Sequence, residues 1–329
     1  MKATRLFTAP LDDVWIQNSD SNLWSPISVS GVKPTARVYH SAVSHDGAYV
    51  TFGGSAVSAG FLNDTWRISP AAGVWEPLSL PVAPAARAGH SAAMLGSDMI
   101  VFGGRGAENI FDDTWVLSLP GKGGGQAQWK LMVTPSTPPP RTSHAAAIAD
   151  VKGPLSAMVL VGGSNVLGKD LVDVWVLLPA CGTWVQAQVQ VPSSGGPIPR
   201  HGHMLHAIPG AAAAGPSSAK FSLIMYGGQS GTSDNDPFLG DTWQLDLALD
   251  APQGVCTSSA PSALRGGGAP ALAATGQWSQ VQTTAPAPRA NMATAIDTAS
   301  DSVLLFGGFS GYGGGLDDRL LHDSWQLAF

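Results

Sequence analysis

One short pattern constrains the fold of this chain more than any other feature: an aspartate and a tryptophan separated by one residue, repeated six times. A motif that keeps returning along a chain is the signature of a repeat protein. Because a single repeat cannot bury its own apolar faces, copies of the unit have to stack on one another. The six copies are Asp13-Val14-Trp15, Asp64-Thr65-Trp66, Asp113-Thr114-Trp115, Asp173-Val174-Trp175, Asp241-Thr242-Trp243 and Asp323-Ser324-Trp325.

Three further landmarks recur in a fixed order around this motif. An arginine followed three residues later by a histidine precedes an apolar run that ends in two glycines, and a lone tryptophan follows the motif. Six motif tryptophans and five lone ones account for all 11 in the chain, so none is left for another purpose. The Arg and His pairs are Arg37 and His40, Arg87 and His90, Arg141 and His144, and Arg200 and His203; the paired glycines end at Gly54, Gly104, Gly163, Gly228 and Gly308; the lone tryptophans are Trp24, Trp75, Trp129, Trp184 and Trp278.

Each landmark predicts one β-strand, which gives a unit of four strands, a to d. The apolar runs before the glycines, such as "VTFGG", are short and rich in β-formers, so both faces of strand b should be buried. In strand c, Trp115 and Leu117 share one face because side chains alternate along a strand. Four-stranded sheets with apolar faces that stack radially form a β-propeller, and we therefore expect an all-β propeller.

The succession of paired glycines, motif tryptophan and second tryptophan resembles the kelch repeat family over nearly the whole chain, which implies a kelch-type β-propeller. The 49 residues from Trp66 to Trp115 are close to the roughly 50 of a kelch unit. Strand c appears six times and the Gly-Gly strand five times, which favours about six blades over a five-bladed ring with a surplus strand. The expected divisions of this single domain, 1–329, are a partial blade at 1–30, full blades at 31–80, 81–133, 134–190 and 191–284, and a blade lacking its last strand at 285–329.

The longest insertion, residues 247–276, is small, polar and rich in Pro and Gly. Such a segment cannot bury enough apolar area to order itself, so it is expected to be a flexible loop.

Composition limits the partners and the compartment. The formal net charge is −6, which argues against nucleic acid and anionic membrane surfaces as partners because both need clustered Lys and Arg. No apolar run has the length of a membrane-spanning helix, and the N-terminus lacks a signal-peptide core. Cys181 and Cys256 are too few for a disulfide framework and fit a reducing compartment. A cytoplasmic protein is the resulting expectation.

The polar residues of the repeat are expected to stabilise the blades and not to carry out a reaction, because they recur in blade after blade. The Arg37 series is expected to donate to loop carbonyls. The aspartate of the motif is expected to accept backbone N–H bonds in the b–c turn. The histidine is replaced by Met292 in the last blade, so the ring tolerates its loss.

Few residues remain for chemistry. His201, His203 and His206 are close in sequence, and zinc uses such ligands. In a strand, positions 201 and 203 share a face and 206 falls on the other, which favours packing histidines over a zinc site. Copper oxidases resembling galactose oxidase need a tyrosine joined to a cysteine, and no residue here is assigned that role. The sequence therefore predicts no catalytic residue, no metal and no cofactor.

The favoured function is a non-catalytic interaction module or scaffold that binds a partner protein. The family resemblance implies that partners dock on the b–c and d–a loops around the channel mouth, where residues after the glycine pairs differ between blades. Two alternatives stay open: an enzyme with a metal or small-molecule site at the channel mouth, and a glycan or metabolite binder. The candidate binding residues are Arg105, Gln229, Asp234, Asp236, Phe309 and Tyr312.

Overall fold

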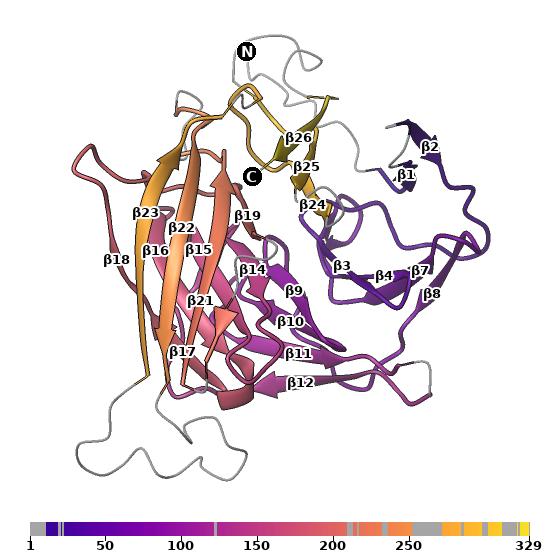
Figure 1. Ribbon diagram of the computed structural model, residues 1–329. Coiled ribbons are helices and arrows are strands. Elements are labelled where there is room, and N and C mark those ends of the chain that lie inside the picture. Colours follow the sequence, from indigo (N-terminus) through magenta and orange to yellow (C-terminus); the bar gives the residue numbers. More distant parts are fainter. Residues whose placement is uncertain are drawn as a thin grey trace. The chain divides into compact units, whose positions relative to one another are not determined.

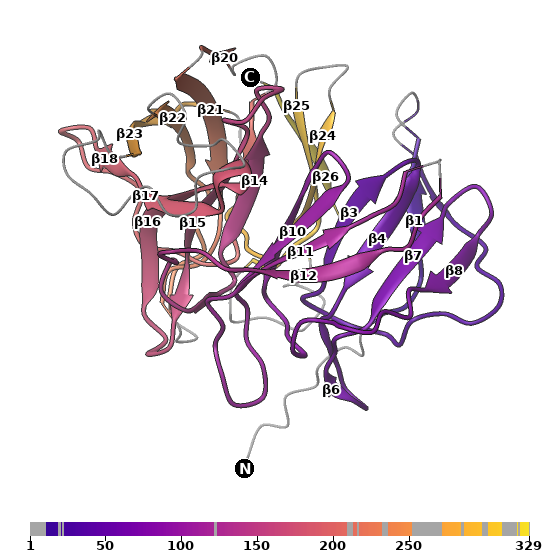
Figure 2. The same ribbon diagram turned by 90° about the horizontal axis from the view of Figure 1, so that it is seen from below.

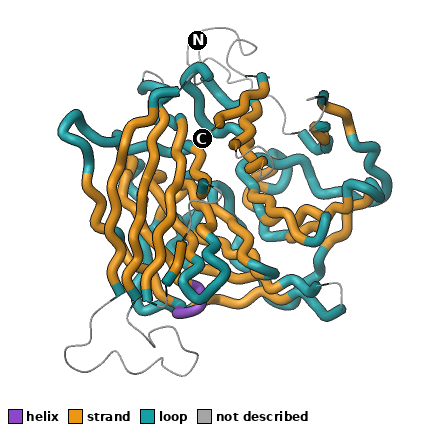
Figure 3. The backbone as a smooth tube through the Cα atoms, in the orientation of Figure 1, coloured by secondary structure: helices purple, strands orange, loops and turns teal. Residues whose placement is uncertain are grey.

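The computed structural model describes residues 11–18, 21, 23–121, 124–208, 213–215, 217–231, 236–251, 272–283, 286–297, 302–310, 321 and 323–328 (Figure 1). The chain divides into two compact units, residues 1–131 and 132–329, each with its own sheets. Strands and loops make up the described residues, apart from the 3-10 helix η1, Pro179–Cys181 (Figure 3). No helix in these ranges is long and apolar enough to cross a bilayer.

The first unit contains two four-stranded antiparallel sheets and two hairpins. Blade one has the order β3-β4-β7-β8 and blade two the order β12-β11-β10-β9. The four strands of each blade therefore lie side by side in chain order, and the small β5–β6 hairpin stands apart from the sheet of blade one. The strands are β1 (Trp15–Gln17), β2 (Trp24–Pro26), β3 (Ser41–His45), β4 (Ala48–Phe52), β5 (Ser55–Ala56), β6 (Gly60–Phe61), β7 (Thr65–Ser69), β8 (Val74–Pro77), β9 (Ser91–Leu95), β10 (Asp98–Phe102), β11 (Thr114–Ser118) and β12 (Gln128–Met132).

The second unit contains three sheets, seen from a second direction in Figure 2. Blade three is built on β14-β15-β16-β17, blade four on β19-β21-β22-β23, and blade five on β24-β25-β26. The strands are β13 (Arg141–Thr142), β14 (Ala145–Ala149), β15 (Ala157–Asn165), β16 (Asp170–Leu178), β17 (Thr183–Gln186), β18 (Gln188–Gln190), β19 (Met204–Ala207), β20 (Ala213–Ala214), β21 (Ser218–Tyr226), β22 (Thr242–Asp250), β23 (Ala273–Val281), β24 (Ala293–Asp297), β25 (Ser302–Phe306) and β26 (Ser324–Ala328).

The all-β, propeller-type fold is confirmed, and the number of blades is corrected from about six to five. The surplus copy of the motif, at Asp13 to Trp15, lies at the start of the β1–β2 hairpin, which pairs only with itself among the described residues. This hairpin supplies a c-type and a d-type strand without a and b strands. Residues 1–10 lie outside the described residues.

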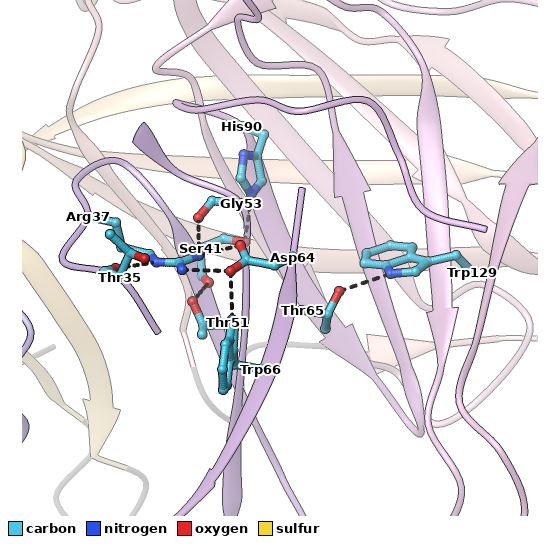
Figure 4. Close-up of polar contacts among 10 residues, drawn as sticks. All are labelled: Thr35, Arg37, Ser41, Thr51, Gly53, Asp64, Thr65, Trp66, His90 and Trp129. Atoms are coloured by element: carbon cyan, nitrogen blue, oxygen red, sulfur yellow. Dashed lines mark hydrogen bonds and ion pairs between the residues drawn. The ribbon is translucent and has the colours of Figure 1, made fainter. Parts of the chain in front are cut away.

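Burial of the b strands and of the d-strand tryptophans organises the core. Val50 and Phe52 of β4 and Val101 of β10 are fully buried, as the apolar runs before the glycines predict. Trp129 of β12 packs on Phe52 with 4.9 Å between ring centroids. Its indole N–H donates to Thr65 Oγ1 at 3.2 Å, so one side chain ties blade two to blade one (Figure 4).

The insertion at 247–276 is ordered at both of its ends. Strand β22 continues to Asp250 and β23 starts at Ala273, and the two strands pair along this whole length. Leu247 and Leu249 are buried in the core that blades three and four share, which explains why the strands continue. The structure thus differs from the expected flexible loop at these ends, whereas residues 252–271 lie outside the described residues.

Cys181, the last residue of η1, is disulfide-bonded. The interpretation of the cysteines as reduced thiols is therefore wrong for this residue. The only other cysteine of the sequence, Cys256, lies outside the described residues.

Backbone hydrogen bonds at the glycine pairs join neighbouring blades within each unit. Gly54 N donates to Arg87 O at 2.8 Å, and Arg87 N donates to Leu62 O at 2.9 Å. The second unit repeats the first of these bonds, from Gly163 to Arg200 and from Gly228 to Arg289. Gly53 has a φ of +63°, and a Cβ there would lie 2.7 Å from Arg87 O. The glycine pair therefore ends strand b and also allows the close backbone contact between neighbouring blades.

Replacing Gly53 by alanine is expected to destabilise the first unit by several kcal/mol, because the added carbon would push Arg87 O out of its bond with Gly54. Gly96→Ala is the matched control: its φ is +61° and nothing lies within 4 Å of the added Cβ. That control should cost only the conformational strain, about 1 kcal/mol. Urea unfolding of both variants measures the difference, and equal losses would contradict the role assigned to the blade contact.

Candidate interaction surface

A buried arginine links the landmarks of each blade to one another (Figure 4). Arg37 donates from Nη1 to Gly53 O at 2.9 Å and forms a bidentate pair with Asp64 at 2.6 and 2.8 Å. Asp64 Oδ2 also accepts the indole N–H of Trp66 at 2.6 Å. One carboxylate thus holds both the arginine that precedes strand a and the tryptophan of strand c.

The same arrangement recurs in the other four blades. The arginines are 0 or 1% exposed, and each binds the carbonyl of the first glycine of its pair. The expectation that the arginines donate to loop carbonyls is confirmed, whereas the expected role of the aspartate is corrected: it accepts from arginine and tryptophan. The sets are Arg87, Asp113 and Trp115; Arg141, Asp173 and Trp175; Arg200, Asp241 and Trp243; and Arg289, Asp323 and Trp325.

These contacts keep the aspartates ionised. Burial raises the pKa of the Asp113 carboxyl, but the hydrogen bonds and positive charge of Arg87 and the Trp115 indole outweigh this effect and lower the pKa below its usual value. At Asp323, the hydrogen bonds from Arg289 are the largest influence and lower the pKa to about 2. The charged form is therefore the structural form of the aspartate in each of the five blades.

The recurring histidines of blades two and four, His90 and His203, are buried in the neutral form. His90 Nε2 lies 2.8 Å from Ser41 Oγ of the preceding blade, and its ring packs edge-on against Phe52. Burial lowers the pKa of His90 to about 3, helped by the charge of Arg87. His203 in the second unit has a pKa lowered to about 3 by burial and by Arg200. These rings pack and do not exchange protons at neutral pH.

The three histidines that are close in sequence, His201, His203 and His206, do not converge on one point. His201 Nδ1 lies 2.9 Å from Asp170 Oδ1, whereas His206 Nε2 lies 2.8 Å from Thr294 Oγ1. His203 is buried. Within the described ranges, no three His, Cys, Asp or Glu side chains come close enough to hold a metal ion.

The candidate binding residues have different environments. Arg105 is exposed and forms backbone bridges with Ala88 and Ile110. Gln229 is 6% exposed, and Asp236 and Phe309 are half-buried. Asp234 and Tyr312 lie outside the described residues. The position after the glycine pair is therefore not equally exposed in all blades.

A buried polar cluster in blades three and four breaks the repeat. Asp170 stands three residues before its motif, where the other described blades have Phe61, Ile110 and Phe238. Its side chain is 4% exposed. His201, which contacts it, stands directly after Arg200, where Val38 and two alanines occupy the equivalent positions in the first two blades and the last blade. We did not single out Asp170 from the sequence, although an alignment of the repeats shows it as the one acidic residue at its position.

Asp170 accepts three hydrogen bonds from two blades. Ser164 Oγ donates at 2.5 Å from the same hairpin, whereas His201 Nδ1 at 2.9 Å and Gly231 N at 2.6 Å belong to blade four. Burial raises the pKa of the Asp170 carboxyl, but the hydrogen bonds of His201, Ser164 and Gly231 lower it more, so the pKa lies below its usual value. The cluster therefore fixes the b–c loop of blade four against the b–c hairpin of blade three.

The fold and the recurring contacts define a repeat-built β-propeller whose shared polar residues maintain the blades. A family model, the KLHDC2/KLHL20/DRC7 Kelch-repeats domain, matches residues 6–214, which is more than half of the 329 residues. The chain therefore belongs to the kelch-repeat family, as the resemblance predicted.

Several curated proteins are similar to the chain. It is 28% identical to Adagio-like protein 3 of Oryza sativa subsp. japonica over 70% of this chain and 34% of that protein. It is 30% identical to an F-box/kelch-repeat protein of Arabidopsis thaliana over 65% of this chain and 43% of that protein. It is 27% identical to host cell factor 2 of Homo sapiens over 60% of this chain and 26% of that protein. The chain thus spans less than half the length of these relatives.

Asp113→Asn is expected to destabilise the protein by about 3 kcal/mol, because it leaves the fully buried Arg87 without a counter-ion. The neighbouring Asp112→Asn makes the same chemical change at an exposed position and should stay within about 0.5 kcal/mol of the wild type. Chemical denaturation measures both. A loss of similar size at the two positions would contradict the structural role of the ion pair.

The free energy of unfolding is expected to fall as the pH falls below about 6.5 and more steeply below about 4. The folded pKa values of His90 and His203, about 3, lie below the ordinary value of 6.5, so the unfolded chain binds more protons in this range. Each such histidine contributes up to about 1.4 kcal/mol per pH unit. The motif aspartates add to the loss below pH 4, because their folded pKa values are also lowered.

Urea unfolding at about pH 7, 5.5 and 4 tests this dependence, because these conditions span roughly the range between the folded and unfolded pKa values of the histidines. Substituting His203 by Gln removes one titrating group and should flatten the slope between the first two conditions. A stability that stays constant over them would show that the buried histidines are not neutral in the folded chain.

Proposed function

We propose that this chain is a non-catalytic interaction module that binds a partner protein through its b–c and d–a loops. The observation that carries the proposal is how the polar residues are used. In the described blades, the recurring arginines and aspartates are engaged in contacts within the blade, and His90 contacts the neighbouring blade. The b–c loops, in contrast, differ from blade to blade, and recognition usually resides in loops on a rigid scaffold.

Arg105 is the clearest single candidate for a binding contact. Its equivalents after the other glycine pairs are Ser55, Ser164, Gln229 and Phe309. Arg105 is exposed and forms no salt bridge with any residue in the described part of the chain. A guanidinium in this setting can pair with a carboxylate of a partner and stack on its aromatic side chains. Charged and aromatic side chains of this kind are frequent hot spots of protein interfaces.

Phe309 and the two acidic candidates extend the proposed contact set in the second unit. Phe309 is half-buried and is held by backbone bonds to Ala290, which presents an aromatic ring on a fixed backbone. Asp236 lies beside Gly231 in the b–c loop of blade four. Asp234, Tyr312 and the buried Gln229 remain proposed from the sequence pattern alone.

A protein partner fits the charge of the chain better than nucleic acid does. The net charge of −6 supplies no electrostatic attraction for phosphate backbones. The cytoplasmic location stays a prediction, and the disulfide at Cys181 weighs against a reducing compartment.

Affinity capture from cell extract tests the proposal with three forms of the purified chain. The wild type is expected to retain one or more proteins, and Arg105→Ala with Phe309→Ala should retain much less because two side-chain anchors are missing. Lys130→Ala is the control, since this exposed cation lies on β12 and not on a b–c loop. Circular dichroism verifies that all three forms keep their β-structure. Retention by the double variant at the wild-type level would show that these loops are not the binding face.

A further inference from the structure

The b–c connection of blade three is a hairpin in which the two blade strands continue past the glycine pair, whereas blade one has only a separate two-residue ladder, β5–β6, at the equivalent place. Strands β15 and β16 continue past the glycine pair, with Gly163 opposite Leu171 and Ser164 opposite Asp170. The corresponding strands of blades one and two end at Phe52 and Phe102, before their glycines. We call residues 163–171 the blade-three finger.

The backbone at the tip of the finger is satisfied internally. Asn165 Oδ1 accepts from Leu167 N at 2.9 Å and from Lys169 N at 3.0 Å. The backbone of Asn165 accepts from Gly168 N and donates to Lys169 O, both at 3.0 Å. Since these N–H donors are used within the turn, a partner cannot recognise the tip by adding a β-strand to it, and recognition there depends on side chains.

Asp170 fixes the base of the finger. It receives Ser164 Oγ from within the finger and His201 and Gly231 from blade four. Because this carboxylate is buried and takes charge-assisted hydrogen bonds, it restricts the hairpin at the point where it leaves the blade. Asp170 is therefore a positioning residue for the tip.

The tip itself displays apolar surface. Val166 is 61% exposed and Leu167 is 86% exposed, although both stand on this fixed backbone. Lys169, beside them, is exposed and forms no salt bridge with another described residue. The surface complementary to two aliphatic side chains and a neighbouring cation is an apolar pocket with a carboxylate at its rim, on the partner.

We infer that the blade-three finger is an anchor that inserts Val166 and Leu167 into an apolar pocket of the partner protein, while Lys169 pairs with an acidic residue beside that pocket. The inference rests on the proposed function and adds the chemistry of the contact. The preformed turn saves the entropy that a flexible loop would lose on binding. A lipid surface is the less favoured target, because the tip is small and the net charge of the chain is negative.

The test uses the full chain and the protein that it retains from cell extract, purified and titrated by calorimetry. Leu167→Asp is expected to weaken binding roughly tenfold to one-hundredfold, the loss expected when one leucine is no longer buried. Leu167→Met keeps an apolar side chain and should stay near the wild type. Leu131→Asp is the matched control, because Leu131 is an exposed leucine on strand β12, outside the b–c and d–a loops.

Two further measurements test the role of the Lys169 charge and the possibility of a lipid target. Lys169→Glu should weaken binding at low salt, with a smaller effect at high salt, because salt screens an exposed ion pair. Neutral phosphatidylcholine vesicles should not retain the chain. Retention by vesicles that is lost in Leu167→Asp would overturn the inference in favour of a lipid target.

The remaining outcomes separate the two proposals. If Leu167→Asp binds the partner as the wild type does, the finger is not the anchor, and the proposed interaction function still stands. If Leu131→Asp weakens binding as much as Leu167→Asp does, the effect is not specific to the finger, which also overturns the inference. If the wild-type chain retains no protein, the proposed function fails and this inference fails with it.

Discussion

The buried bidentate ion pair between arginine and aspartate is the interaction on which each blade depends. It joins the segment before strand a to the start of strand c, and it brings the first glycine carbonyl and the motif tryptophan into the same cluster. A fully buried guanidinium is costly without a counter-ion. The aspartate is consequently required at that position.

The sequence predicted the strands well because strand signals are local. Alternation, paired glycines and tryptophan spacing are visible within a few residues, and they placed strands b, c and d correctly in the described blades. The partner of the aspartate was not predictable in this way. Arg87 and Asp113 are 26 residues apart, and Arg200 and Asp241 are 41 apart, so their contact depends on how the sheet folds and not on any neighbouring residue.

The number of blades and the blade-three finger were missed for different physical reasons. The motif at Asp13 to Trp15 counts as a blade only if two further strands pair with it, and the described hairpin has none. Asp170 was overlooked because a lone acidic residue near a turn is ordinary in a sequence. Its unusual character appears only against the apolar residues at the equivalent positions, and its donors come from a different blade.

The candidate surface illustrates how a symmetric scaffold acquires one distinctive site. The recurring residues are used to hold the blades, so distinctive chemistry appears where a blade departs from the shared pattern, as at Arg105 and at the Asp170 cluster. Arg105 and Asp170 differ in their exposure to solvent. Arg105 faces solvent directly, whereas Asp170 is buried and acts through the hairpin that it positions.

The arginine and its aspartate belong to the same blade, whereas the bonds between blades at the glycine pairs are made by backbone atoms. Each repeat therefore carries its own arginine neutralised by its own aspartate. A gene encoding such a chain can gain or lose a whole repeat by duplication or deletion without separating any of these arginines from its aspartate. Modular inheritance of this kind follows directly from where the charges are placed.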